Sequence, residues 1–402
     1  MNSMTVNSFV NLCFLSYLIV KPAISRLLIG FDGAGRSIAI LAIAVLLTNF
    51  SEIEFWKTGK NKPVLIWGIW CLYVSIAWII IGERTSVELS PIVFIFNSIF
   101  VPFLALYVTC YEVCKSPAIS TKVLLYSFIT YCVMGLVLQT PSNVNVRGGE
   151  ILGNDMPLTA VCMLTVAALR YVRKWDKPII FYVCLLLCTL AVFMAATRKA
   201  FGGELIIIAA VILSLFDIRR GSNFILMIAL FICTYLAFGF IMDNTLLGAR
   251  MGEIDESAEI YNTTNSPILN LLGDRAYFYI NGWQLFTEHP IFGIGIFNFR
   301  AAMNTRLPIH SEYIVQICET GIIGGILFIL FYYYIFKSIK QTRFISDERS
   351  TRMVSYGWLL TLLFISLTAW TYQFPRYFIV TGMILGYCGN IIDNSLKNTC
   401  SK

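Results

Sequence analysis

The stretch RLPIHSEYIVQICETGIIGGILFILFYYYIF, residues 306–336, begins with polar residues and continues as an apolar run long enough to cross a membrane. About 20 apolar residues in helical form span the roughly 30 Å hydrocarbon core of a bilayer. Similar runs recur along the chain, which is 57% hydrophobic and 13% charged over 402 residues. This composition excludes an ordinary soluble protein and predicts a polytopic membrane protein.

The apolar runs predict an all-α fold, because backbone groups in lipid must be bonded internally and the alternation of a β-barrel is not seen. We expect a transmembrane helical bundle that forms one integral membrane domain over residues 1–402, with about twelve spans. The predicted spans are residues 5–25, 34–50, 63–82, 91–110, 121–140, 155–171, 178–196, 201–217, 223–242, 310–336, 353–371 and 376–393.

Basic residues are distributed unevenly among the predicted loops. If the N-terminus is cytoplasmic, most of the 30 lysines and arginines fall on the cytoplasmic side, including those of loops 57–62, 170–177 and 337–352. This distribution follows the positive-inside rule and predicts the orientation. The net charge of +7 is spread among loops and forms no basic arm, so nucleic acid is not an expected partner.

Residues 243–309 form a long polar segment on the predicted outer side, between the ninth and tenth spans. A loop of this length in a compact bundle is usually functional or disordered. Within it, Asp274 is expected to start an interfacial helix that runs to about Glu288 and is stopped by Pro290. The following sequence HPIFGIGIFNF, residues 289–299, predicts a tight turn because of its proline and paired glycines.

The two histidines of the chain, His289 and His310, both lie in this region. His310 is expected in the first turn of the following helix, where the helix dipole favours the neutral imidazole that a general base requires. The alternative is a structural histidine at the interface. Further along, Glu312 and Glu319 share a face, and Glu319 would lie about 13 Å into the membrane. An intramembrane carboxylate indicates function, or else a structural ion pair with an arginine.

Arginines on the outer side are the candidate anion ligands. Arg198 lies in a tight turn between two spans, and Arg275 lies on the interfacial helix, on the same face as Tyr279. A guanidinium matches phosphate geometry, although an arginine can also extend toward lipid headgroups. Arg147 is a weaker candidate. No phosphate-binding loop, outer D-x-D motif or metal-ligand cluster is found, so we expect arginines rather than a metal ion to stabilise an anionic leaving group.

Three stretches together resemble the O-antigen polymerase/ligase family of bacterial membrane glycosyltransferases. They are AATRKAFGGELIIIAAVIL (195–213), GDRAYFYINGWQLFTEHPIFGIGIFNF (273–299) and HSEYIVQICETGIIGGILFIL (310–330). In the family pattern an arginine opens a span, an Arg…Trp…Pro-x-x-Gly-x-Gly segment follows, and a His-(Asn/Ser)-x-(Tyr/Leu)…Glu-x-Gly segment comes last. Ser311 stands where many relatives have asparagine, which leaves the orientation of the acceptor open.

The resemblance implies a transferase without metal or cofactor, in the bacterial inner membrane with its active site facing the periplasm. It would transfer an oligosaccharide from undecaprenyl pyrophosphate to an acceptor hydroxyl. Arg198 and Arg275 would hold the pyrophosphate, and His310 would activate the acceptor. The residues expected to bind substrate are Glu319, Glu312, Tyr313, Trp283, Tyr279 and Arg147.

The sequence does not decide which acceptor is used, or whether the protein is a transferase or a transporter. A polymerase of O-antigen or another surface polysaccharide, which extends a second lipid-linked repeat unit, is the first choice because the sequence is atypical and polymerases diverge with each glycan. A ligase acting on the lipid A core is the alternative. A transporter of lipid-linked oligosaccharide is the rival from another class, and it predicts broken helices paired between two halves. Membrane lipid and a chain-length regulator are the other expected partners.

Overall fold

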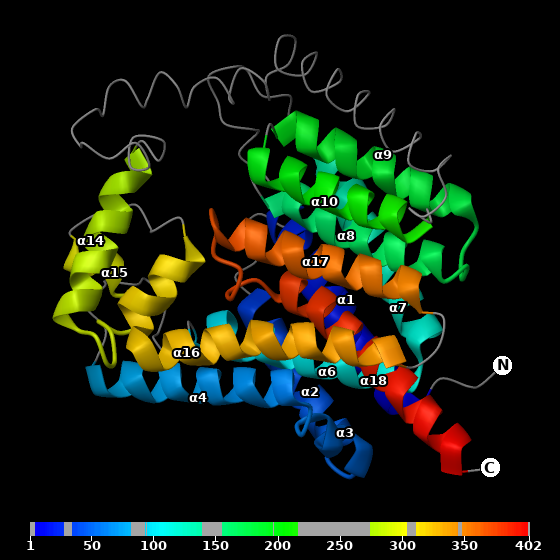
Figure 1. The fold of residues 1–402 in the computed structure, drawn as a ribbon, viewed down its shortest axis with the longest axis horizontal. Coiled ribbons are helices and arrows are strands. Elements are labelled where there is room, and N and C mark those ends of the chain that lie inside the picture. The colour runs from blue at the N-terminus through cyan, green and yellow to red at the C-terminus, as the bar shows by residue number, and fades with distance from the viewer. Residues whose placement is uncertain are drawn as a thin grey trace.

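The computed structural model describes residues 5–27, 34–81, 93, 95–138, 155–195, 197–215, 274–303, 311–344 and 348–400. Every element in these ranges is a helix, as Figure 1 shows. The helices are α1 (Val6–Leu27), α2 (Ala34–Asn49), α3 (Ile53–Thr58), α4 (Lys62–Ile81), η1 (Phe96–Phe100), α6 (Val101–Lys115), α7 (Pro117–Leu138), α8 (Asp155–Val172), α9 (Pro178–Ala195), α10 (Arg198–Leu215), α14 (Asp274–Glu288), α15 (Phe299–Ala302), α16 (Glu312–Gln341), η2 (Thr342–Phe344), α17 (Arg349–Ser366) and α18 (Pro375–Cys400).

Seven described segments are long and apolar enough to cross a membrane: Val6–Ser25, Lys62–Ile81, Phe96–Lys115, Pro117–Val137, Asp155–Val172, Pro178–Ala195 and Glu312–Gln341. They correspond to seven of the predicted spans, so the polytopic membrane class is confirmed. Four other predicted spans are helical, as α2, α10, α17 and α18, but are shorter or more polar. The predicted span at 223–242 lies outside the described residues. The total of twelve spans therefore remains a prediction.

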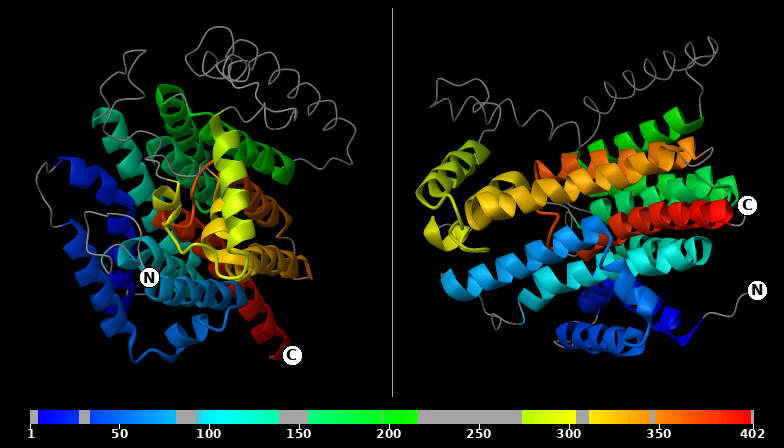
Figure 2. Two further views of the ribbon diagram at one scale, coloured as in Figure 1. Left: turned by 90° about the vertical axis from the view of Figure 1, so that its left-hand side faces the viewer. Right: turned by 60° about the horizontal axis from the view of Figure 1, so that its bottom comes forward.

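The long helices lie side by side in one bundle (Figures 1 and 2). We call the end that carries α14, α15 and the start of α16 the α14 end, and the end where α18 terminates the opposite end. Trp67 of α4 occupies the centre, with its ring centroid 4.4 Å from that of Trp70, 4.6 Å from Phe331 and 5.0 Å from Phe378. These ring contacts join α4, α16 and α18 into one apolar core.

Helix α16 is broken near its N-terminal end. Its sequence predicts a continuous span, but Gly321 has φ 63° and ψ −167°, a conformation that only glycine adopts readily. A break in a helix releases backbone groups that must be bonded again, because none of them can reach water inside a bilayer. The loop that follows α14 provides hydrogen-bond partners for these groups.

The loop Pro290–Gly295 bonds to the backbone at the break. In α16, the Ile322 N–H donates to the Pro290 carbonyl of the loop at 2.8 Å. From the loop, the Ile294 N–H donates to the Cys318 carbonyl and the Gly295 N–H to the Glu319 carbonyl, each at 3.0 Å. The Tyr73 hydroxyl donates to the Thr320 carbonyl at 2.7 Å. The predicted tight turn is thereby confirmed, with Gly293 and Gly295 at positive φ.

Replacing Gly321 by alanine is expected to destabilise the protein. A Cβ there would lie 2.3 Å from the Ile291 carbonyl oxygen, and the backbone conformation would cost about 1–3 kcal/mol for a residue with a side chain. Thermal unfolding of the detergent-purified protein should show a lowered melting temperature for Gly321→Ala. Gly389→Ala is the control, because its Cβ would meet only the Cys114 Sγ at 3.4 Å. Equal melting temperatures for the two variants would contradict the role of the break.

Candidate functional site

The last turn of α17 is the place where the segments that carry the candidate residues meet. The Tyr313 hydroxyl, in the first turn of α16, donates to the Leu363 carbonyl at 2.9 Å. The Tyr279 hydroxyl of α14 donates to the Leu367 carbonyl at 3.3 Å. The final carbonyls of a helix have no partner within the helix and accept bonds from side chains. Two tyrosines thus fasten α14 and α16 to one turn of α17.

Arg198 is the first residue of α10, as the family pattern implies, although the predicted span began only at residue 201, and its side chain is half-buried. One turn later Gly202 packs against α17, where an added Cβ would lie 2.4 Å from the Phe364 ring. Phe364 lies between Leu363 and Leu367, the two residues that accept the tyrosine hydroxyls. The start of α10 therefore reaches the same turn of α17 as α14 and α16.

Some of the other predicted site residues lie outside the described part of the chain. Arg275 lies on α14, one turn before Tyr279, but its side chain is outside the described part of the chain. His310 and Arg147 also lie outside the described residues. Helix α16 begins at Glu312 with Ser311 as its N-cap, so the expectation that His310 lies in the first turn of this helix, where the helix dipole would favour a neutral imidazole, is wrong. Trp283, on α14, is 55% exposed.

Glu312 fastens the loop after α17 to the first turn of α16. Its buried carboxylate accepts the Ser366 hydroxyl at 3.1 Å, the Thr371 N–H at 2.7 Å and the Thr371 hydroxyl. Sequence reasoning selected Glu312 but missed both partners, because neither residue carries a local signal of this contact. Substrate binding by Glu312 stays a prediction.

Glu319 fastens the turn after α14 to the end of the same helical segment. The carboxylate is buried and accepts the backbone N–H of Phe297 at 2.9 Å and of Phe299 at 3.3 Å. Phe297, held at φ +66°, stacks on Tyr372 with ring centroids 6.1 Å apart. The loop after α17 and the turn after α14 therefore touch each other as well as α16. Substrate binding by Glu319 likewise stays a prediction.

Two further arginines at this end are engaged by protein groups. The Arg376 guanidinium is buried, donates to the Asp155 carboxylate at 2.9 Å and lies 4.5 Å from the Phe374 ring centroid. The Arg300 guanidinium lies 5.7 Å from the Trp370 ring centroid. Burial raises the pKa of Tyr372, in the same loop, well above its usual value, and the Glu319 carboxylate raises it further. The Tyr372 hydroxyl is therefore neutral at physiological pH.

A metal site is not apparent in the part of the chain that the structure describes, where no group of three or more His, Cys, Asp or Glu side chains could hold an ion. The expectation of a metal-independent reaction is not tested by this observation, because His310 and the acidic residues of 243–273 lie outside that part. In the described arrangement, α10, α14 and the first turn of α16 all contact the last turn of α17.

The comparisons with known proteins point to one family. The family model described as O-antigen ligase matches residues 159–329. The matched range runs from α8 to the middle of α16, and it includes Arg198, Arg275 and His310. No curated protein matches the chain.

Replacing Glu319 by glutamine is expected to loosen the turn after α14 while the bundle stays folded. The single oxygen of the amide can accept only one of the N–H groups of Phe297 and Phe299, and the other would face the NH2 group and lose its partner, which costs about 1–3 kcal/mol for a buried group. Hydrogen–deuterium exchange in residues 296–299 should become roughly tenfold faster or more. Glu288→Gln, exposed at the end of α14, should leave this exchange unchanged. Exchange at the wild-type rate in Glu319→Gln would show that the carboxylate does not hold the turn.

Proposed function

We propose, from the match of residues 159–329 to the family model described as O-antigen ligase, that the chain is a membrane glycosyltransferase using a glycan linked to undecaprenyl pyrophosphate. The observation that carries the proposal is the convergence of α10, α14 and the first turn of α16 on the last turn of α17. These three segments bear Arg198, Arg275 and, directly before the last, His310.

Arg198 and Arg275 are assigned to the pyrophosphate of the donor. A guanidinium binds phosphate oxygens in a bidentate manner and keeps its charge at any physiological pH. The C-terminal end of α17 carries partial negative charge, which favours cations beside it. Arginines placed there before the donor arrives can stabilise the charge that develops on the leaving group without reorganising.

His310 is assigned as the general base. Its imidazole takes the proton of the acceptor hydroxyl while the hydroxyl oxygen forms a bond to the anomeric carbon of the donor. The bond between that carbon and the pyrophosphate oxygen breaks, and undecaprenyl pyrophosphate leaves with the bonding electron pair. Proton removal of this kind requires a neutral histidine near pH 7, which the ordinary pKa of histidine provides.

The remaining predicted residues are given two kinds of role. Trp283 exposes more than half of its surface on α14, and we assign it to the face of a donor sugar. Glu312, Glu319, Tyr279 and Tyr313 bond to protein groups in the described structure. We therefore assign these four residues to positioning the segments that contact substrate. Arg147 remains a predicted donor ligand.

The α14 end is proposed to face the periplasm. Basic residues of the last turn of α8, of the α8–α9 loop and of the end of α16 gather at the opposite end of the bundle, among them Arg170, Arg173, Lys174, Lys177 and Lys340. The positive-inside rule assigns that end to the cytoplasm. A bacterial inner membrane with donor presented from its outer leaflet fits this orientation.

Polymerisation of a surface polysaccharide is the first proposal for the acceptor, which would be a second lipid-linked repeat unit, and a chain-length regulator is the accompanying proposed partner. Ligation to the lipid A core is the second proposal, favoured by the description of the matching family model. A transporter is less well supported. It predicts broken helices in pairs, whereas among the described helices only α16 has an internal non-helical residue.

Alanine substitutions should separate the three proposed catalytic residues from their neighbours. His310→Ala should lower transfer by roughly 10²–10⁴-fold, as expected for loss of a general base. Arg198→Ala and Arg275→Ala should each lower it by about 10²–10³-fold, as expected for loss of charge stabilisation. Lys199→Ala and Arg306→Ala are the matched controls and should lose less than about tenfold, since neither is assigned a role at the reacting atoms. Transfer would be measured in membranes with a lipid-linked oligosaccharide. Full activity in any of the first three would remove that residue from the mechanism.

The gel pattern of surface glycan should identify the acceptor. A host that lacks this gene and keeps its own core ligase would be complemented with wild type or His310→Ala. Loss of the ladder to core plus one repeat unit, restored by wild type alone, would establish a polymerase. Bare core with accumulated lipid-linked polymer would establish a ligase. A ladder restored equally by His310→Ala would contradict the histidine base and favour transport.

A further inference from the structure

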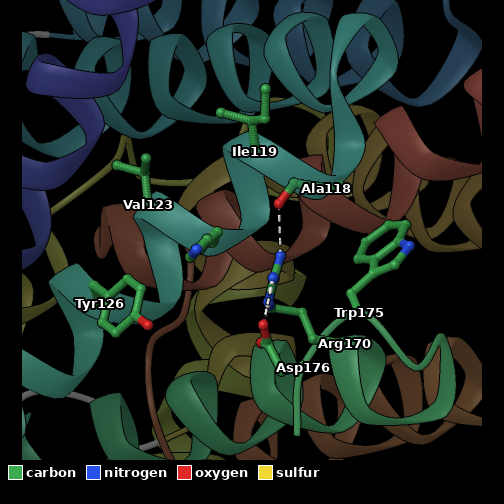
Figure 3. Close-up of a pocket in the computed structure, with 8 residues that line it drawn as sticks. Ala118, Ile119, Val123, Tyr126, Arg170, Trp175 and Asp176 are labelled. Atoms are coloured by element: carbon green, nitrogen blue, oxygen red, sulfur yellow. Dashed lines mark hydrogen bonds and ion pairs between the residues drawn. The ribbon is translucent and has the colours of Figure 1, made fainter. Parts of the chain in front are cut away.

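A groove opens at the opposite end of the bundle, between the start of α7 and the loop that follows α8 (Figure 3). It has a volume of about 530 Å³. Its walls come from one face of α7, from the end of α8 and from the loop between α8 and α9. The lining residues are Ala118, Ile119, Lys122, Val123, Tyr126, Arg170, Trp175 and Asp176.

The floor of this groove is an ion pair between buried Arg170 and partly exposed Asp176. Figure 3 shows the Arg170 guanidinium between the Ala118 carbonyl and the Asp176 carboxylate. Arg170 donates to the Asp176 Oδ1 at 2.8 Å, to the Ala118 carbonyl at 2.7 Å and to the Thr121 hydroxyl at 2.6 Å. The guanidinium lowers the pKa of Asp176, so the carboxylate is charged and balances Arg170. The pair therefore contributes polarity to the floor but no net charge.

Lys122 gives the groove a net positive charge, because the lining holds two cations, Arg170 and Lys122, and one carboxylate, Asp176. The Lys122 side chain is exposed, and no carboxylate among the described residues lies within ion-pair distance of it. It follows Ile119 by three residues and precedes Tyr126 by four, so these side chains share one face of α7. A cation thus stands one turn into a helix that is long and apolar enough to span the membrane.

An apolar stripe leads from the groove along the outside of α7. Ile119, Tyr126 and Val133 are spaced by seven residues and are 45%, 50% and 43% exposed. Residues at this spacing lie on the same side of a helix, and the stripe extends for about 21 Å. Helix α7 is long and apolar enough to span a membrane, and in that placement this exposed side would face hydrocarbon. A soluble phosphate compound has no apolar part that could contact this stripe, whereas the acyl chain of a lipid could lie along it.

We propose that this groove binds one anionic phospholipid of the adjacent leaflet, with the headgroup phosphate at Lys122 and an acyl chain along Ile119, Tyr126 and Val133. Trp175, whose ring lies over the Arg170 guanidinium at 5.6 Å, borders the headgroup position, where tryptophan is favoured at a membrane interface. The inference stands on the groove, its charge and its stripe, and it does not depend on the proposed transferase activity.

The test is native mass spectrometry of the full-length protein released from phosphatidylcholine nanodiscs that contain increasing phosphatidylglycerol. Wild type should retain one phosphatidylglycerol that Lys122→Gln retains about five-fold more weakly, the effect of one lysine near an anionic headgroup. Lys122→Arg should restore retention because it keeps the charge. Lys340→Gln is the matched control, since it removes the same charge from an exposed site at the same end of the bundle.

Equal loss of phosphatidylglycerol from Lys122→Gln and Lys340→Gln would mean that only general surface charge attracts the lipid, and unchanged retention in Lys122→Gln would exclude the site. Glycerol 3-phosphate at millimolar concentration should not displace the bound lipid. Displacement at that concentration would show that the groove takes a soluble phosphate and not a lipid. Because Lys122 is exposed, its variants should remain folded, which size-exclusion chromatography would verify.

Discussion

The break of α16 at Gly321 is the constraint on which the rest of the α14 end depends. A helix interrupted at membrane depth exposes carbonyl and N–H groups that lipid cannot satisfy. The loop Pro290–Gly295 supplies backbone partners for three of the four groups, and the Tyr73 hydroxyl supplies the fourth. Because that loop is continuous with α14, satisfying the break also determines where α14 lies. A local backbone requirement in one helix thereby positions a second helix that precedes it by more than 20 residues.

The last turn of α17 extends this arrangement to the remaining segments. Helix ends are suitable meeting points, because their final carbonyls accept bonds from any neighbour that offers a hydroxyl. Here Tyr279 and Tyr313 use the carbonyls of Leu367 and Leu363, and Gly202 allows α10 to approach Phe364 between them. Segments far apart in sequence are thus held in fixed positions relative to the same turn of α17, which serves as a common reference. Such a reference suits a two-substrate reaction, whose rate depends on holding donor and acceptor groups in a fixed relation.

Much of this organisation follows from local sequence patterns, and the rest does not. The bounds of α14 were predictable because Asp274 and Pro290 are local start and stop signals, and the turn because its glycines demand positive φ. Seven spans were predictable from length and apolar content alone. The break of α16 was not, because a glycine among apolar residues equally indicates close helix packing. The bonds of Glu312 to Ser366 and Thr371 join positions more than 50 residues apart, for which a single sequence holds no signal.

The two buried glutamates have a further consequence for the charge of the site. A carboxylate inside a membrane protein commonly recruits an arginine, as Asp155 recruits Arg376 and Asp176 recruits Arg170 in this chain. Glu312 and Glu319 instead accept hydroxyl and backbone N–H donors, which satisfy their oxygens without supplying positive charge. Among the described residues, neither glutamate forms an ion pair with an arginine, and each anchors a loop through these donors. An acidic anchor that uses neutral donors competes less with an anionic ligand for cationic side chains, which is the electrostatic condition that the proposed pyrophosphate donor would require.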